Sequence, residues 1–184
     1  GRTVLEHAVS AFEENKTIDE IVIVSHADHL QRVKALKDQN SWKKVAHIVP
    51  GGRERYDSSL AAMTLYRDAS GVNLLFHDAA RPLLSQRIIL DVTESLNQHS
   101  AVGVGIPSSD TLWEACDGII RHIPDRNTLW RAQTPQAFQI EVISQAYDKA
   151  LKDPDFRVTD DCGVVRKYLP ETEIYIVPGE ERNM

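Results

Sequence analysis

Cysteine is scarce in this chain: Cys116 and Cys162 are the two cysteines among 184 residues, and they lie far apart. Neither stands at the spacing of a metal-ligand motif, so the sequence gives no indication of a structural zinc site. A disulfide between them is the alternative. We prefer to interpret both as free thiols in a reducing compartment, and we therefore expect a cytoplasmic protein.

Long apolar runs and an excess of positive charge are also missing. No apolar run approaches the roughly 20 residues needed to span a bilayer, and Gly1 to Leu5 contain no signal-peptide core. The net charge is −6, and local lysine pairs such as Lys43-Lys44 are too small to reverse it. We therefore expect neither nucleic acid nor a membrane as a partner. No G-x-G-x-x-G pattern follows a predicted strand, which disfavours a dinucleotide-dependent oxidoreductase.

Short apolar runs alternate with segments of helical periodicity along the whole chain. Apolar residues make up 42% and charged residues 26%, as in an ordinary soluble domain. Runs that are apolar on both faces are typical of parallel strands covered by helices. The pattern predicts a three-layer, Rossmann-like α/β fold in a single domain, residues 1–184. The predicted strands are 21–24, 45–49, 72–76, 101–106 and 174–177; the predicted helices are 4–12, 27–37, one capped by Asp57 or Ser58, 86–96, 142–151 and 160–167.

The alternation breaks at residues 110–129. Two short strand-like segments, 110–116 and 119–123, flank Asp117-Gly118, a favoured pair for a type I′ hairpin turn. Because a parallel sheet has no place for an inserted hairpin, we expect this segment to project from the domain as a β-arm.

Three polar clusters follow predicted strands, where ligands bind in open α/β sheets. The first is Gly51-Gly52 with Ser58, between a strand and a helix N-terminus that can accept anions. A simple turn is the alternative. The second is His77-Asp78-Ala79-Ala80-Arg81, which is either a charged site or a local Asp–Arg ion pair. In this cluster we expect His77 to be packed or hydrogen-bonded rather than catalytic.

The third cluster is distributed along the second half of the chain. Taken singly, its members could each be turn or capping residues, and their order along the chain is what favours a function. The members are Asp110-Thr111, Asp125-Arg126, Gln133 to Gln136, and Thr159 to Asp161.

Five motifs together resemble those of the 2-C-methyl-D-erythritol 4-phosphate cytidylyltransferase family, which includes the similar ribitol-5-phosphate cytidylyltransferases. The resemblance runs from the first residue to the last. The motifs are GGRERYDSS, FHDAARP, PSSDTL, PDRNTLWRAQTPQAF and VTDDC.

The resemblance implies a nucleotidyltransferase domain whose β-arm embraces a second subunit in a homodimer. It also implies a reaction in which a sugar-alcohol (alditol) phosphate attacks the α-phosphorus of CTP, with Mg²⁺ as cofactor and pyrophosphate as the second product. A phosphate monoester has a second pKa near 6 and is already ionised at neutral pH, so cations that hold two polyanions matter more than a general base. An arginine-rich site without a Ser–His–Asp or Cys–His arrangement fits that demand.

The resemblance also implies roles for particular residues. Gly51, Gly52, Ser58 and Ala79 would bind the nucleotide. The other roles are catalytic for Asp78, Arg81 and Arg126, and substrate-binding for Thr111, Thr134 and Thr159, with Thr111 and Arg126 supplied by the arm of the partner subunit. No residue is predicted to ligate a metal directly.

Two family features are expected outside this sequence: a Gly-rich loop upstream and a lysine just downstream of Asn183. We therefore expect residues 1–184 alone to be nearly inactive. The tail from Asp160 to Met184 resembles the ribitol branch more. Ribitol 5-phosphate is therefore the substrate favoured here, and 2-C-methyl-D-erythritol 4-phosphate is the alternative. A non-catalytic dimerisation or binding relative is the rival from another class. The preferred cation and any fused reductase are left open.

Overall fold

The computed structural model describes residues 1–157 and 159–183. No helix within these residues is both long and apolar enough to cross a membrane. The elements follow in the order α1 (Val4–Glu13), β1 (Ile21–Ser25), η1 (Ala27–His29), α2 (Leu30–Asn40), β2 (Val45–Pro50), α3 (Arg55–Thr64), β3 (Asn73–Phe76), α4 (Gln86–Ser95), β4 (Ala101–Pro107), β5 (Glu114–Cys116), β6 (Ile119–His122), η2 (Arg126–Thr128), β7 (Trp130–Gln139), α5 (Ile140–Ala150), α6 (Asp161–Tyr168) and β8 (Tyr175–Pro178).

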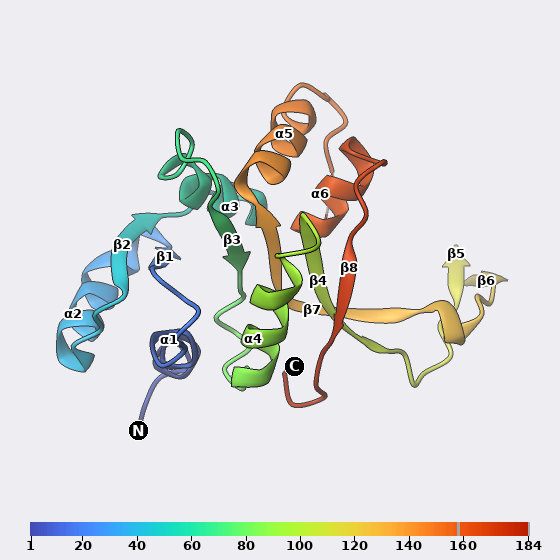
Figure 1. Cartoon of the computed structure of the whole chain (residues 1–184). Helices are drawn as coiled ribbons and strands as arrows, with labels where there is room; N and C mark the ends of the chain where they lie inside the picture. Colours follow the sequence, from blue (N-terminus) through green and yellow to red (C-terminus); the bar gives the residue numbers. More distant parts are fainter. Residues whose placement is uncertain (158, 184) are drawn as a thin grey trace.

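A four-stranded mixed sheet forms the centre of the molecule, with strand order β3-β7-β4-β8. Strand β7 runs antiparallel to both neighbours, and β8 runs parallel to β4. Because side chains alternate along a strand, Phe138 packs among residues of α5 and α6 while Ala137 packs among residues of α4. The sheet therefore lies between two helical layers, as the sequence predicts (Figure 1).

Strands β1 and β2 form a separate parallel pair with its own small core. Val9 of α1, Val33 of α2 and Trp42 pack against Ile23 and Val45 of this pair. Helix α1 starts with a capping box between Thr3 and Glu6, which satisfies two backbone amides that the helix leaves without partners. Two residues beyond Val9 on α1, Ala11 packs in the core of the four-stranded sheet.

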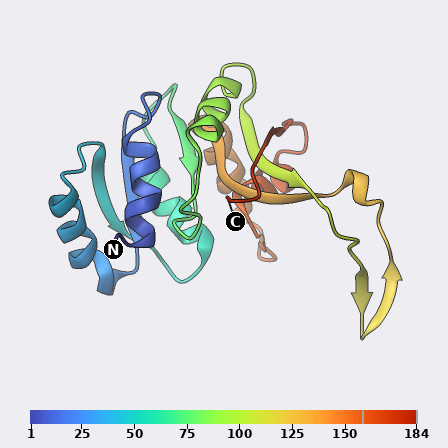
Figure 2. The ribbon, with the colours of Figure 1, turned by 90° about the horizontal axis from the view of Figure 1, so that it is seen from below.

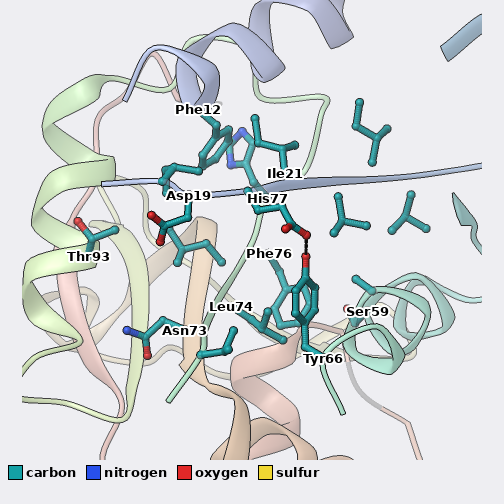
Figure 3. Close-up of a pocket in the computed structure, with 18 of the residues that line it drawn as sticks. Phe12, Asp19, Ile21, Ser59, Tyr66, Asn73, Leu74, Phe76, His77 and Thr93 are labelled. Carbon is teal, nitrogen blue, oxygen red and sulfur yellow. Dashed lines mark hydrogen bonds between the residues drawn. The ribbon is translucent and has the colours of Figure 1, made fainter. Parts of the chain in front are cut away.

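A cavity of about 920 Å³ lies between the two sheets, lined by residues of β1 on one side and β3 on the other. Within the described residues, β1 pairs with β2 and β3 with β7, so no backbone ladder joins β1 to β3. Figure 3 shows Phe12 beside His77 in this cavity and Tyr66 further along its wall; Tyr66 donates a hydrogen bond to Glu20.

The β-arm is confirmed. Strands β5 and β6 pair antiparallel, and Asp117 and Gly118 have φ angles of 51° and 75°, as a type I′ turn requires. Figure 2 shows the arm extending well away from the rest of the molecule. Its exposed large apolar side chains are Leu112, Trp113, Ile119, Ile120 and Ile123, followed by Trp130 at the start of β7.

Three details differ from the predicted elements. Strand β7 was not predicted, because the polar residues and the proline of Gln133–Gln136 look like a loop in the sequence; the strand runs through them, and all four are buried. Helix α3 begins at Arg55, with Glu54 as its N-cap and Asp57 accepting from the Glu54 amide. The segment predicted as a helix over 27–37 consists of η1 followed by α2.

Candidate functional site

The glycine turn between β2 and α3 packs tightly against the first turn of α3. The Gly51 amide donates to the Ser25 carbonyl at 2.9 Å. A Cβ on Gly51 would lie 2.7 Å from the Ser58 hydroxyl oxygen, and one on Gly52 would lie 2.4 Å from the Asp57 side chain. A side chain at position 52 would therefore displace Asp57, whereas one at position 51 would first require the Ser58 hydroxyl to rotate away.

The loop after β3 is joined to β7 through Thr134. The Asp78 amide donates to the Thr134 hydroxyl at 3.1 Å, and this hydroxyl lies 3.0 Å from Nδ1 of His77. The other ring nitrogen, Nε2 of His77, lies 3.0 Å from the Arg81 carbonyl. The His77 ring therefore links the start of the loop to Thr134 of β7 and to the end of the loop at Arg81.

The protonation of His77 follows from these contacts. Burial lowers the pKa of His77, so the ring is neutral near pH 7. The Arg81 carbonyl can only accept, so Nε2 carries the proton and donates to it. Nδ1 must then accept from the Thr134 hydroxyl. Both nitrogens are used in positioning, which agrees with the expectation that His77 is hydrogen-bonded rather than catalytic.

Asp78 lies between two arginines. Its Oδ2 is 3.7 Å from Nε of Arg81, and its Oδ1 is 3.7 Å from Nη2 of Arg55. Arg81 also donates to the Asn183 carbonyl at 2.9 Å. Asn183 in turn donates from its side-chain amide to the Thr134 carbonyl at 2.9 Å. The C-terminal segment therefore closes this side of the site.

The residues predicted for the nucleotide and for catalysis are brought together in part. Ser58, Asp78 and Ala79 line the cavity between the sheets, and Arg55 lines it with them. Thr134 is buried, with its hydroxyl engaged by the His77–Asp78 loop. Thr159 is exposed next to Asp160, the residue that caps α6.

Thr111 and Arg126, the two arm residues, are not brought to this cavity. Both are exposed, and neither lines the cavity in the described part of the chain. Arg126 begins the short helix η2, which Asp125 caps through the Asn127 amide at 3.0 Å. Their predicted role requires a second subunit and stays a prediction.

Three residues that contribute to the site were not assigned a role from the sequence: Arg55, Asp161 and Asn183. Asp161 is fully buried and lies 2.7 Å from Arg55. A signal was present for the first two, since Arg55 stands three residues after the glycine pair and two acids stand at the start of α6. The contact between them joins positions 106 residues apart, so neither motif alone could reveal it.

The described residues contain no cluster of three or more His, Cys, Asp or Glu side chains that could hold a metal ion. Asp78 alone, with a guanidinium group near each oxygen, does not form a metal cage.

Comparisons with known proteins agree with this geometry. The family model described as 2-C-methyl-D-erythritol 4-phosphate cytidylyltransferase matches residues 1–184. A protein of that name from Thermobifida fusca is 45% identical, over all of this chain and 76% of the relative. A bifunctional ribulose 5-phosphate reductase/CDP-ribitol pyrophosphorylase from Haemophilus influenzae is 39% identical, over all of this chain and 39% of the relative.

Among solved structures, 4-diphosphocytidyl-2C-methyl-D-erythritol synthase from Anaerococcus prevotii superposes with a TM-score of 0.90 at 28% identity. The match covers all of this chain and 80% of that one. The family model therefore covers the whole chain, including the glycine turn and the Asp78–Arg81 loop. This chain therefore belongs to the 2-C-methyl-D-erythritol 4-phosphate cytidylyltransferase family of nucleotidyltransferase enzymes.

Proposed function

We propose that the protein transfers CMP from CTP to 2-C-methyl-D-erythritol 4-phosphate and releases pyrophosphate. The observation that carries this choice is the 45% identity to the Thermobifida fusca protein of that name, against 39% to the CDP-ribitol pyrophosphorylase. It reverses the preference for ribitol 5-phosphate that the tail of the sequence suggested. Ribitol 5-phosphate is now the alternative, supported by the Haemophilus influenzae relative.

One residue of the tail that favoured the ribitol branch, Cys162, has a packing role. The Cys162 amide donates to the side chain of Gln136 at 2.9 Å, and a Cβ on Gly103 of β4 would lie 3.3 Å from the Cys162 sulfur. Burial raises the pKa of the Cys162 thiol, which keeps it uncharged. The cysteine therefore packs between α6 and the sheet.

The charges at the site suit transfer between two phosphates. The substrate phosphate is largely ionised at neutral pH and can attack without a general base. Neutral His77 is occupied with positioning, while Arg81 can bind phosphate oxygens and offset charge in the transition state. We include Mg²⁺ in the proposal: bound to the triphosphate, it would neutralise part of the leaving pyrophosphate's charge.

We also propose that two copies associate through the β-arm, so that Thr111 and Arg126 of each serve the other's site. The arm exposes several large apolar side chains, with Trp113 at 63% and Ile123 at 54% exposure. A projecting pair of short strands cannot cover these residues by itself. If the arm of each copy packed against the other copy, the apolar residues of both arms would be covered.

The test of substrate choice is a pyrophosphate-release assay on the full-length protein with CTP and each alditol phosphate in turn. We expect kcat/KM to be at least about 10-fold higher for 2-C-methyl-D-erythritol 4-phosphate, since pockets separate substrates of this similarity by roughly 10- to 200-fold. CTP alone is the control and should release little pyrophosphate. A higher kcat/KM for ribitol 5-phosphate would reverse the proposal within the family.

A further inference from the structure

Asp161 is a fully buried carboxylate at the start of α6. Its Oδ1 accepts a 2.7 Å hydrogen bond from the Tyr147 hydroxyl, and its Oδ2 lies 2.7 Å from Nη1 of Arg55. A buried charge is tolerated only when it is paired and hydrogen-bonded, so this contact fixes one edge of the Arg55 guanidinium group.

The other edge of the guanidinium group faces Asp78. Nη2 of Arg55 is 3.7 Å from Oδ1 of Asp78, and both residues line the cavity between the sheets. Burial lowers the pKa of Arg55, but its attraction to Asp161 and Asp78 outweighs this effect and the net pKa is raised, so the side chain stays charged. A planar guanidinium group can serve two carboxylates at once, which an ammonium group does less well.

We infer that Arg55 is a positioning residue for cytidylyl transfer: anchored by Asp161, it holds the Asp78 carboxylate in the orientation that the reaction needs. Asp78 then has a fixed partner from α3 as well as one from its own loop, Arg81. Arg81 consequently keeps donors available for the substrate. The inference rests on the cytidylyltransferase activity of the family and does not depend on which alditol phosphate is used.

A purely structural role is the competing explanation, in which Arg55 does no more than neutralise Asp161. Thermal stability and activity separate the two. Arg55→Lys keeps the charge near Asp161 but cannot hold both carboxylates. We expect it to lower kcat/KM for the alditol phosphate by about 100-fold, the usual effect of a misplacement of roughly 1 Å. The KM for CTP and the melting temperature should change much less.

A double-mutant cycle gives the sharpest test. In an Asp78→Asn background the carboxylate that Arg55 positions is gone, so Arg55→Lys should add less than about threefold to the loss. If the loss of kcat/KM in the double variant equalled the product of the two single losses, the inference would be overturned. Arg67→Lys is the matched control, because Arg67 lies at the same 3.7 Å from an exposed carboxylate, Asp148, and should leave both readouts unchanged.

A second variant covers the case in which single substitutions fold poorly. Arg55→Gln with Asp161→Asn removes the buried charge of Asp161 together with the charge of its partner, and it leaves side chains that can hydrogen-bond to each other. We expect the melting temperature to recover relative to Arg55→Gln alone, while kcat/KM stays about 100-fold low. Recovery of both would show that Arg55 is structural. The assays use CTP with whichever alditol phosphate wild-type protein converts, so a wrong substrate assignment would not affect the result.

Discussion

The four-stranded sheet and the β-arm are joined directly, since β4 leads into the arm and β7 leads out of it, yet their surroundings are opposite (Figure 1). Phe138 in β7 is completely buried between the sheet and α5. Eight residues further back in the chain, Trp130 is 42% exposed, and Trp113 in the arm is 63% exposed. The same kinds of apolar side chain thus stabilise the sheet within one chain but remain uncovered in the arm.

This difference separates two uses of apolar residues. Those of the sheet stabilise the fold of a single chain by leaving water. Those of the arm contribute no such free energy until another surface covers them, so they can stabilise the association of two chains instead. Substitutions in the two regions should therefore change different measured quantities.

The largest effect is expected in the sheet. Phe138→Ala removes a fully buried ring and should lower the free energy of unfolding by about 3–5 kcal/mol. Trp113→Ala in the arm should change it by less than about 0.5 kcal/mol. Urea denaturation at a concentration where monomers predominate measures both. A similar loss for the two variants would mean that the arm packs against its own chain in solution.

The next effect tests whether the arm completes a neighbouring site. Arg126→Ala and Arg81→Ala should each lower kcat/KM by about 2–5 kcal/mol in activation free energy, because each removes a charge-assisted contact to the substrate. Mixing the two proteins should restore activity, since a heterodimer has one site with both arginines. Arg121→Ala, which removes a charge elsewhere on the arm, is the control and should stay active.

Subunit exchange in that mixture is verified by mass spectrometry. If exchange occurs and no activity returns, Arg126 does not act on a partner subunit. An Arg126→Ala protein that loses stability but keeps its activity per site would point to a structural role at η2, next to the Asp125 cap.

A smaller effect concerns association itself. Trp113→Ala should weaken self-association by roughly 2 kcal/mol, as expected for an aromatic residue at the centre of an interface. Leu83→Ala is the matched control, because Leu83 is 56% exposed on the body of the molecule and should leave association unchanged. Analytical ultracentrifugation gives the dissociation constants. Equal constants for wild type and Trp113→Ala would contradict an interface through the arm.

The smallest effect lies in the body and depends on pH. Hydrogen bonds from Tyr168, from the Asp155 amide and from Lys167 lower the pKa of Asp153 to about 2, against an ordinary value of 3.8. The folded state binds this proton less readily than the unfolded state, so the contribution is present above about pH 4 and is lost as the pH falls towards 2. Asp153→Asn should flatten the pH dependence of the unfolding free energy in that window, and identical slopes would refute this.

The sequence predicts most of the fold because apolar periodicity records which faces are buried. It fails at β7, where buried polar side chains take the place of apolar ones. Gln133 bonds to Glu180 and Asn183, and Gln136 bonds to Asp160 and Cys162. Each buried amide is satisfied by a residue from far along the chain, and such partners are invisible to a local pattern.

The candidate site was likewise predicted where local sequence patterns suffice and missed where the contacts are long-range. Ser58, Asp78 and Ala79 follow predicted strands, and their meeting in one cavity agrees with the rule that ligands bind at strand ends. Arg55 and Asp161 were missed because their contact depends on how α3 and α6 pack. The binding role of the two glycines of the turn stays a prediction; a Cβ at either position would meet side chains of α3.

The position of α1 has a consequence for how binding is transmitted. The Gly51–Ser58 turn belongs to the β1–β2 pair and the Asp78–Arg81 loop to the four-stranded sheet, and α1 packs against both through Val9 and Ala11. A ligand that contacts the turn and the loop together would therefore bind to two elements that α1 joins. Amide hydrogens of α1 should then exchange more slowly when the ligand is bound, while those of β7 change little. Helix α1, although it contributes no predicted binding residue, would report occupancy of the site.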